Sequence, residues 1–283
     1  MPNNILILGN GYIGGELFIR LTTLGHNVIL VGRKDLDYHN QNIFKKYLLN
    51  NNVDTVINCS GFTGRPNVDE GEIKKELCWD LNVNLPLQIT QTCNSVGVKM
   101  IHISSGCIYN GYDKDYTETD APNFGLFDFS SFYSKTKHAF ETLSRDKTLK
   151  ILRIRMPITN DSNDRNFIKK ILKYDNLIDF RNSKTHIPDL ANVVDNLLKV
   201  DRLGFWRGQD IYNVVNPDPL TTREVCKIMK MSGKENKNWK FVNMEDLDIK
   251  APRSNCVLDG SKLDSIYKMR TEREIIEESC QYV

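Results

Sequence analysis

The strongest constraint on the fold is a short apolar run that ends in closely spaced glycines. Ile5–Leu8 contains no polar residue, as expected for a buried parallel strand, and an amphipathic stretch follows the glycines. In such a strand–turn–helix unit, glycines permit a tight turn and close backbone approach, and the helix amino terminus attracts phosphates. A purely structural glycine turn would give the same G-x-G-x-x-G run. We predict a dinucleotide site contacted by Gly9, Gly11, Tyr12, Ile13 and Gly14.

The alternation of strand and helix repeats along the first half of the chain. It predicts the α/β class, with a Rossmann-type doubly wound parallel sheet over residues 1–155. Polar loops and short helices then predict a smaller irregular carboxyl-terminal lobe over residues 156–283, mainly for substrate binding, from which a strand near 211–215 could return to the sheet. Further strands are expected at Asn27–Val31, Thr55–Cys59, Lys99–Ser104 and Lys150–Arg155, and helices at Gln41–Asn50, Leu81–Ser95 and Tyr133–Leu143.

The residues after the second expected strand predict which cofactor binds. An NAD site places a carboxylate there to hold the ribose hydroxyls. This chain has Arg33 and Lys34, which favour the ribose phosphate of NADP (NADPH when reduced). Asp35 follows at once, so the two cations could instead be solvated charges on a loop. The backbone after the next strand usually passes the cofactor, which adds Ser60 and Gly61 to the expected contacts.

Composition and charge exclude several other classes of protein. Among the 283 residues, 38 Lys and Arg oppose 36 Asp and Glu, and this balance argues against a protein that coats nucleic acid. The seven cysteines form no C-x-x-C pair, which speaks against a zinc site or a disulfide framework, and no metal is expected. No apolar stretch reaches about 18 residues, so no membrane span is expected. We predict a cytoplasmic protein with reduced thiols.

A second group of residues predicts acid–base chemistry. Tyr133 and Lys137 are four apart at the start of an expected helix, so they share one face, although a bare Y-x-x-x-K often marks a solvated face. We expect the lysine ammonium to lower the pKa of Tyr133. Ser105 ends a central strand, where it can hydrogen-bond a substrate carbonyl. If extended geometry continues, Cys107 projects to the same side, unless it is only a small buried apolar side chain.

These residues resemble a known group of enzymes. The glycine run, Ser105, Tyr133 and Lys137 resemble the extended short-chain dehydrogenase/reductase superfamily. Longer strings resemble the plant-type UDP-4-keto-6-deoxy-glucose 3,5-epimerase/4-reductases, which make UDP-L-rhamnose, and the match covers nearly the whole chain. Bacterial dTDP-4-dehydrorhamnose reductases and GDP-fucose synthases are more distantly similar. The matching strings are GFTGRPNVD (61–69), SSGCIY (104–109), APNF (121–124), SFYSKTK (131–137), RIRMPIT (153–159), RNFIKKI (165–171) and APRSN (251–255).

The resemblance implies a bifunctional reaction. A ketone at sugar carbon 4 acidifies the protons on carbons 3 and 5, so both centres can be inverted before NADPH reduces carbon 4. The family's acid–base cysteine falls on Cys107, and its lysine partner falls on Lys170, with adjacent Lys169 as the alternative. Tyr133 then supplies the proton to oxygen. A 4-reductase without epimerase activity and a non-catalytic regulatory subunit of the same fold stay open.

The resemblance also implies binding residues. Asp37 and Tyr38 fall where relatives contact adenine, although a loop carboxylate without a role is the alternative for Asp37. Arg65, Asn166 and Arg253 are candidates for holding the substrate diphosphate or sugar, or else for surface or interdomain ion pairs.

The sequence departs from the family pattern at two places. Its glycine run is one residue shorter than the family's G-x-x-G-x-x-G, which affects the detail of the diphosphate contacts. It also lacks the amino-terminal 4,6-dehydratase domain of some plant relatives, so we expect a separate dehydratase to supply the UDP-sugar. UDP and dTDP sugars stay open as substrates. Relatives commonly dimerise, and we expect a homodimer.

Overall fold

The centre of the molecule is one parallel β-sheet. The computed structural model describes residues 2–65, 67–200, 205–233 and 237–283. The sheet has six strands in the order β10-β6-β4-β3-β1-β2, and all neighbouring strands are parallel. This topology confirms the predicted α/β class. The strands are β1 (Asn4–Leu8), β2 (Asn27–Val31), β3 (Thr55–Asn58), β4 (Lys99–Ser105), β6 (Leu149–Ile154) and β10 (Gln209–Asn213).

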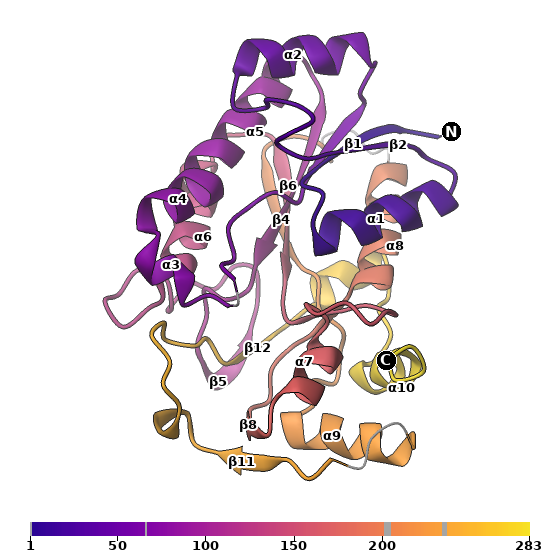
Figure 1. Ribbon diagram of the computed structural model, residues 1–283. Coiled ribbons are helices and arrows are strands. Elements are labelled where there is room, and N and C mark those ends of the chain that lie inside the picture. Colours follow the sequence, from indigo (N-terminus) through magenta and orange to yellow (C-terminus); the bar gives the residue numbers. More distant parts are fainter. Residues whose placement is uncertain (1, 66, 201–204, 234–236) are drawn as a thin grey trace.

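Helices cover both faces of this sheet (Figure 1). The pair α1 and α8 packs on one face, and α2, α5 and α6 pack on the other. A π-helical turn, η1, precedes α5, so the helix expected from residue 81 is divided in two. The bounds are α1 (Tyr12–Thr23), α2 (Gln41–Asn50), η1 (Asp80–Asn84), α5 (Leu85–Ser95), α6 (Phe132–Leu143) and α8 (Ile187–Lys199).

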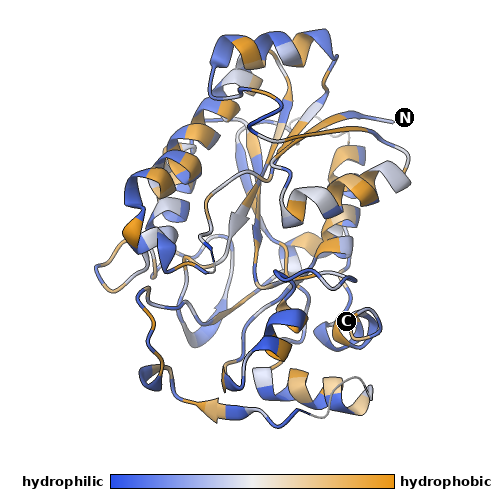
Figure 2. Cartoon of the chain, viewed as in Figure 1, coloured by the Kyte–Doolittle hydropathy of each residue, from blue (hydrophilic) through white to orange (hydrophobic). Residues whose placement is uncertain are grey.

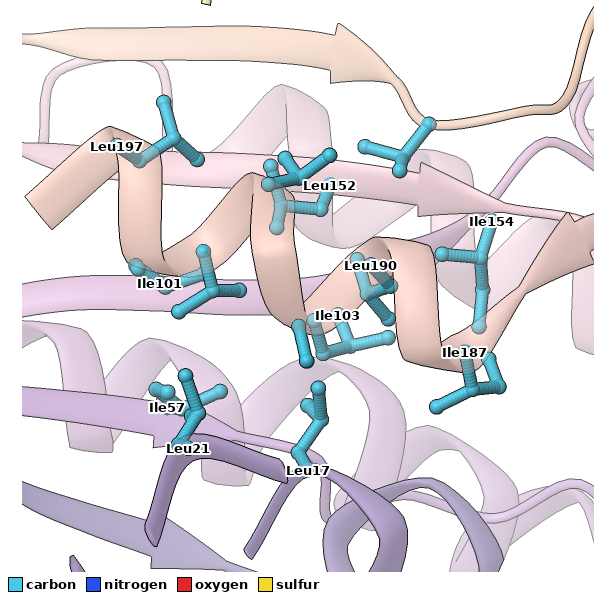
Figure 3. Close-up of a cluster of buried hydrophobic side chains, with 14 of the residues drawn as sticks. Leu17, Leu21, Ile57, Ile101, Ile103, Leu152, Ile154, Ile187, Leu190 and Leu197 are labelled. Atoms are coloured by element: carbon cyan, nitrogen blue, oxygen red, sulfur yellow. The ribbon is translucent and has the colours of Figure 1, made fainter. Parts of the chain in front are cut away.

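The side chains of β1 explain why the sheet is buried on both faces. Ile5 and Ile7 belong to the cluster under α1 and α8, whereas Leu6 and Leu8 belong to the opposite cluster. Because successive strand residues point to opposite faces, a strand without polar residues needs cover on both sides. Figure 3 shows the first cluster, with residues of α1 and α8 meeting side chains from β3, β4 and β6.

A smaller lobe extends beyond one end of the sheet and has its own core. Figure 1 places α7, α9, β8 and β11 together there, and Figure 2 shows that their hydrophobic residues alternate with hydrophilic ones. The core of the lobe includes Ile168, Val225 and Ile275. Not all of residues 156–283 lie in the lobe, because α8 and β10 belong to the main sheet layer. The other helices are α3 (Glu70–Ile73), α4 (Lys75–Trp79), α7 (Phe167–Lys173), α9 (Thr222–Met231) and α10 (Glu272–Ser279), with short helical turns η2 (Met244–Asp246) and η3 (Ser261–Ser265).

Short parallel strand pairs lie outside the main sheet, and one of them, β8 with β11, lies within the smaller lobe (Figure 1). β5 pairs with β12, β7 with β9, and β8 with β11. Among the described helices, none is long and apolar enough to cross a membrane. The pairs are β5 (Gly111–Tyr116) with β12 (Cys256–Leu258), β7 (Pro157–Ile158) with β9 (Thr185–His186), and β8 (Asn176–Ile178) with β11 (Lys240–Val242).

Candidate active site

The glycine turn between β1 and α1 has the shape of a diphosphate cradle. Gly9 has a φ of +101°, and a Cβ there would lie 2.8 Å from the backbone nitrogen of Ser60. A Cβ on Gly14 would lie 2.1 Å from the carbonyl oxygen of Gly9. Gly11 is the N-cap of α1, has open space beside it, and no described side chain caps the helix there. The first-turn N–H groups are therefore free to receive phosphate oxygens.

The adjacent glycines Gly14 and Gly15 give a matched test of this turn. Gly14→Ala is expected to lower the free energy of unfolding by about 1–3 kcal/mol, because its Cβ would overlap the Gly9 carbonyl. Gly15→Ala is the control, since nothing lies within 4 Å of a Cβ there, and alanine favours the helix by about 1 kcal/mol. Urea unfolding measures both. Equal effects of the two substitutions would contradict this account of the turn.

Tyr12 and Ile13 start α1 beside the glycines. The Tyr12 hydroxyl lies 2.8 Å from Oγ1 of Thr159, so this residue links the cofactor turn to the loop that leads into the smaller lobe. Burial raises the pKa of Tyr12. Ile13 packs against the cluster under α1 and α8. Cofactor contacts by either residue stay predictions.

The loop after β2 presents two cations to solvent. Arg33 and Lys34 are exposed, and neither forms an ion pair within the described residues. Asp35 turns back instead, and its Oδ2 accepts a hydrogen bond from the Gly32 N–H at 2.7 Å. The Asp35 carboxylate therefore stabilises the turn and does not pair with either cation. This arrangement leaves Arg33 and Lys34 available for a ribose phosphate.

Asp37 and Tyr38 have local roles in the next loop. The Asp37 carboxylate accepts hydrogen bonds from the N–H groups of His39 and Asn40, at 3.2 and 3.4 Å. The Tyr38 side chain is buried, only 2% exposed, and burial raises its pKa although its hydroxyl hydrogen-bonds Ser60. A ring so deeply packed has little surface left for adenine. The adenine contacts stay predictions.

Ser105, Tyr133 and Lys137 meet where β4 ends and α6 begins. Ser131 caps α6, with its hydroxyl accepting the Ser134 N–H at 3.1 Å, and this fixes the first turn that carries Tyr133. The Ser105 hydroxyl hydrogen-bonds the Tyr133 phenol. Lys137 Nζ lies 5.7 Å from the centre of the Tyr133 ring. The hydroxyls of Ser105 and Tyr133 can therefore both donate hydrogen bonds to one carbonyl oxygen.

The predicted effect of Lys137 on its neighbour is not what the structure shows. Burial raises the pKa of Tyr133, and the Ser105 hydrogen bond and the nearby Arg155 only partly oppose this. Burial also lowers the pKa of Lys137 to about 8. Taking both groups out of water disfavours their charged forms, and this is the largest cause of both pKa shifts. Tyr133 is therefore held in the protonated form that can donate a proton.

Cys107 lies beside this group, but not on a continued strand. β4 ends at Ser105, and the chain turns at Gly106, where a Cβ would lie 2.4 Å from Leu258 Cδ1. The expected extended geometry is therefore wrong, because Gly106 lets the backbone turn against β12. The turn still brings the two residues together, since the Cys107 N–H donates to Ser105 Oγ at 3.2 Å. Cys107 is partly exposed.

Lys169 and Lys170 lie on α7 in the smaller lobe. Lys170 is the more exposed of the two, and its pKa is lowered by partial burial of its ammonium, with Arg165 and Lys173 nearby. Arg165 links this part of the smaller lobe to the loop after β3, because its Nη1 donates a hydrogen bond to Thr63 Oγ1 at 2.9 Å. The catalytic assignments of Lys170 and of its alternative Lys169 stay predictions.

The three predicted substrate residues have different surroundings. Asn166 is fully buried and is the N-cap of α7, where its Oδ1 accepts the Ile168 N–H at 3.1 Å. Arg253 forms an ion pair with Asp69 at 2.7 Å, which matches the alternative of an interdomain pair. Of the three residues, only Arg65 is exposed to solvent. Substrate contacts by all three stay predictions.

The sequence of the chain matches one protein family over almost its entire length. Residues 3–282 match the family described as the RmlD substrate binding domain. The chain belongs to this family. The parallel sheet, the glycine turn and the Ser105–Tyr133–Lys137 group therefore lie in an RmlD-family protein, and the family match spans both the sheet layer and the smaller lobe.

Several relatives of this RmlD-family chain have names that state an activity. A bifunctional dTDP-4-dehydrorhamnose 3,5-epimerase/dTDP-4-dehydrorhamnose reductase of Arabidopsis thaliana is 36% identical over 220 residues, covering 74% of this chain and 69% of the relative. A trifunctional UDP-glucose 4,6-dehydratase/UDP-4-keto-6-deoxy-D-glucose 3,5-epimerase/UDP-4-keto-L-rhamnose-reductase of the same plant is 35% identical, and this chain spans 32% of its length. The crystal structure of the L780 UDP-rhamnose synthase from Acanthamoeba polyphaga mimivirus superposes with a TM-score of 0.86 at 26% identity, covering 98% of this chain and 100% of that one.

Two buried residues of the site in this RmlD-family chain were not found from the sequence. Asn82 lies in η1. Its Oδ1 accepts a hydrogen bond from the Phe62 N–H, and its Nδ2 donates to the Phe62 carbonyl and to Thr136 Oγ1, the latter at 3.1 Å. It thus joins the loop after β3 to α6. Arg155 follows β6, and its Nη1 lies 3.6 Å from Cys107 Sγ. A π-helical segment of five residues is too short to show a periodic pattern in the sequence. For Arg155, only its position after a central strand could have signalled a role in the site.

Proposed function

We propose that this protein converts UDP-4-keto-6-deoxy-D-glucose into UDP-L-rhamnose by 3,5-epimerisation followed by NADPH-dependent reduction of the 4-keto group. The observation that carries this proposal is the meeting of Ser105, Tyr133, Lys137 and Cys107 at the end of β4. The first three suit carbonyl reduction, and the fourth adds a thiol within the same group. The names of the plant relatives and of the viral UDP-rhamnose synthase support the same reaction.

The glycine turn and the loop after β2 fit NADPH. Gly9, Gly11 and Gly14 leave backbone room for its diphosphate, and Arg33 and Lys34 offer charges to its ribose phosphate. When bound, NADPH supplies the hydride for carbon 4. A related dTDP-4-dehydrorhamnose reductase from Bacillus anthracis with a similar fold was crystallised in complex with NADP, which is consistent with this choice.

Reduction needs a proton for the oxygen on carbon 4, and Tyr133 is placed to give it. Ser105 and Tyr133 hold that oxygen by hydrogen bonds, and the raised pKa of Tyr133 keeps its proton available until negative charge develops. After Tyr133 has given up its proton, Lys137, whose Nζ lies 5.7 Å from the centre of the ring, would return a proton to the phenolate and regain one from water. General acid catalysis of this kind works best when the donor is protonated at the working pH.

Epimerisation uses the same ketone as an electron sink. A base removes the proton from carbon 3 or carbon 5, the electron pair moves onto the carbon 4 oxygen as an enolate, and an acid returns a proton on the other face. Cys107 is one partner in this exchange. Lys170 is the other, with Lys169 as the alternative.

The substrate and assembly follow from the same proposal. Arg65 is the clearest candidate for the substrate diphosphate, with Arg253 and Asn166 at the lobe interface. A 4,6-dehydratase activity, which the name of the trifunctional plant relative includes, would supply the 4-keto sugar. A homodimer is the expected assembly. A dTDP-linked sugar is the alternative substrate, as the name of the bifunctional plant relative indicates.

Incubation with UDP-4-keto-6-deoxy-D-glucose and NADPH in deuterated water tests this function. We expect UDP-L-rhamnose labelled at carbons 3 and 5, identified by NMR. Cys107→Ala should lower deuterium incorporation by at least about 100-fold, the low end for an acid–base residue, while still reducing a pre-epimerised substrate. Cys59→Ala is the control, because Cys59 is also partly exposed but follows β3.

The other products would identify the alternatives. Unlabelled UDP-6-deoxy-D-glucose would indicate a 4-reductase that does not epimerise the sugar. Turnover of a pre-epimerised substrate alone would indicate a 4-reductase that depends on a separate epimerase. The absence of turnover with any 4-keto-6-deoxy sugar nucleotide would indicate a binding subunit and overturn the proposal.

A further inference from the structure

One buried charge near the site has no carboxylate within ion-pair distance in the described part of the chain, although Glu272 attracts it from farther away. Arg155 is only 2% exposed, and its hydrogen bonds go to neutral acceptors: Ser254 Oγ at 2.8 Å, Asn182 Oδ1 at 2.6 Å and the Ser254 carbonyl at 3.1 Å. Its Nε is buried without a partner. A buried guanidinium without a carboxylate is costly, because arginine stays charged even when removed from water.

The neighbouring buried arginine shows the contrast. Arg153, two residues earlier, is equally buried but forms a bidentate ion pair with Glu141, with its Nη2 at 2.7 Å from Oε2. That pair satisfies its own charge within the core. Arg155 Nη1 instead lies between neutral oxygens and a thiol: it is 2.8 Å from Ser254 Oγ, 3.4 Å from the Gly106 carbonyl and 3.6 Å from Cys107 Sγ.

We infer that Arg155 is a positioning residue that holds Cys107 as a thiolate, so that Cys107 is the base of the epimerisation. This inference rests on the proposed function. The thiolate would take the proton from the sugar carbon, forming S–H and breaking C–H, and the electron pair would move onto the carbon 4 oxygen. A nearby fixed cation favours thiolate over thiol.

Other groups that face the Cys107 thiol do not replace this cation. Tyr133 and Lys137 approach from α6, and Cys256 from β12. Burial disfavours the charged form of all three, whereas arginine has no accessible neutral form. Arg155 is therefore the permanent charge beside the sulfur.

Alkylation of Cys107 by iodoacetamide as a function of pH, followed by peptide mass spectrometry of the substrate-free full chain, tests the inference. The wild-type profile is expected to have its midpoint at least about one pH unit below that of a free thiol, ~8.5. Arg155→Met should raise the midpoint by about one unit or more, which lowers the rate at neutral pH about tenfold. Arg155→Lys should keep most of the wild-type profile.

Ser254→Ala is the matched control. It removes one hydrogen bond to Arg155 and one to the Tyr109 carbonyl but leaves the guanidinium beside the sulfur, so the midpoint should not move. A merely structural role of Arg155 would predict similar profiles for wild type and a folded Arg155→Met variant, and that result would overturn the inference. If Arg155→Met does not fold, a wild-type midpoint equal to that of a free thiol overturns it.

The result separates this inference from the proposed function. Alkylation needs no substrate, so a low wild-type midpoint without deuterium exchange contradicts the epimerase activity and supports the thiolate. Deuterium exchange with an unshifted alkylation profile supports the activity and contradicts the role of Arg155.

Discussion

Replacing Tyr133 with Phe is expected to lower kcat for 4-keto reduction by about 10²- to 10⁴-fold, the range for loss of a general acid. In the proposed reaction the phenol is the proton donor; burial raises its pKa, and it hydrogen-bonds Ser105. Phenylalanine retains the ring and its packing, so the variant should fold and bind NADPH as the wild type does. NADPH oxidation measures kcat, and fluorescence titration measures cofactor binding.

A second readout separates the two halves of the reaction. Because the proposed proton exchange at carbons 3 and 5 would use Cys107, Tyr133→Phe should still incorporate deuterium, although more slowly if the phenol also stabilises the enolate. Tyr282→Phe removes a hydroxyl from an exposed tyrosine and is the control. A Tyr133→Phe variant with wild-type kcat would exclude Tyr133 as the proton donor.

The layered fold could be predicted from the sequence because its signals are local. The apolar run Ile5–Leu8, the glycines after it and the repeated alternation each specify an element within a few residues. Ser105, Tyr133 and Lys137 could be predicted for the same reason, since strand ends and a four-residue helical spacing fix their place.

What the sequence could not predict depends on tertiary contacts. The rise in the pKa of Tyr133 reflects burial, which a neighbouring lysine in the sequence does not reveal. The turn at Gly106 depends on Leu258, and the surroundings of Arg155 come from Asn182 and Ser254, each distant along the chain. The capping role of Asn166, in contrast, could have been predicted from the sequence, because an asparagine directly before an apolar helical pattern is a common N-cap signal.

The largest effect on stability is expected from an ion pair inside the smaller lobe. Lys184 and Glu272 are 1% and 0% exposed at the side chain, with Nζ 2.8 Å from Oε2. Glu272 also accepts the N–H groups of Lys184 and Leu220, at 2.7 and 2.9 Å. Glu272→Ala would leave an ammonium and two N–H groups buried without this acceptor. We expect it to lower the free energy of unfolding by about 3–5 kcal/mol, measured by urea unfolding.

Two further variants show whether the pairing itself causes this loss. Glu277→Ala, on the same helix, breaks an exposed pair with Arg273 and should cost less than about 1 kcal/mol. In the double variant Lys184→Met/Glu272→Leu, no charge is left unpaired, so it should be more stable than Glu272→Ala alone. If the double variant is as unstable as the single one, the loss comes from packing around α10 rather than from the unpaired ammonium. A Glu272→Ala loss no larger than that of Glu277→Ala would show that the buried pair does not hold the lobe together.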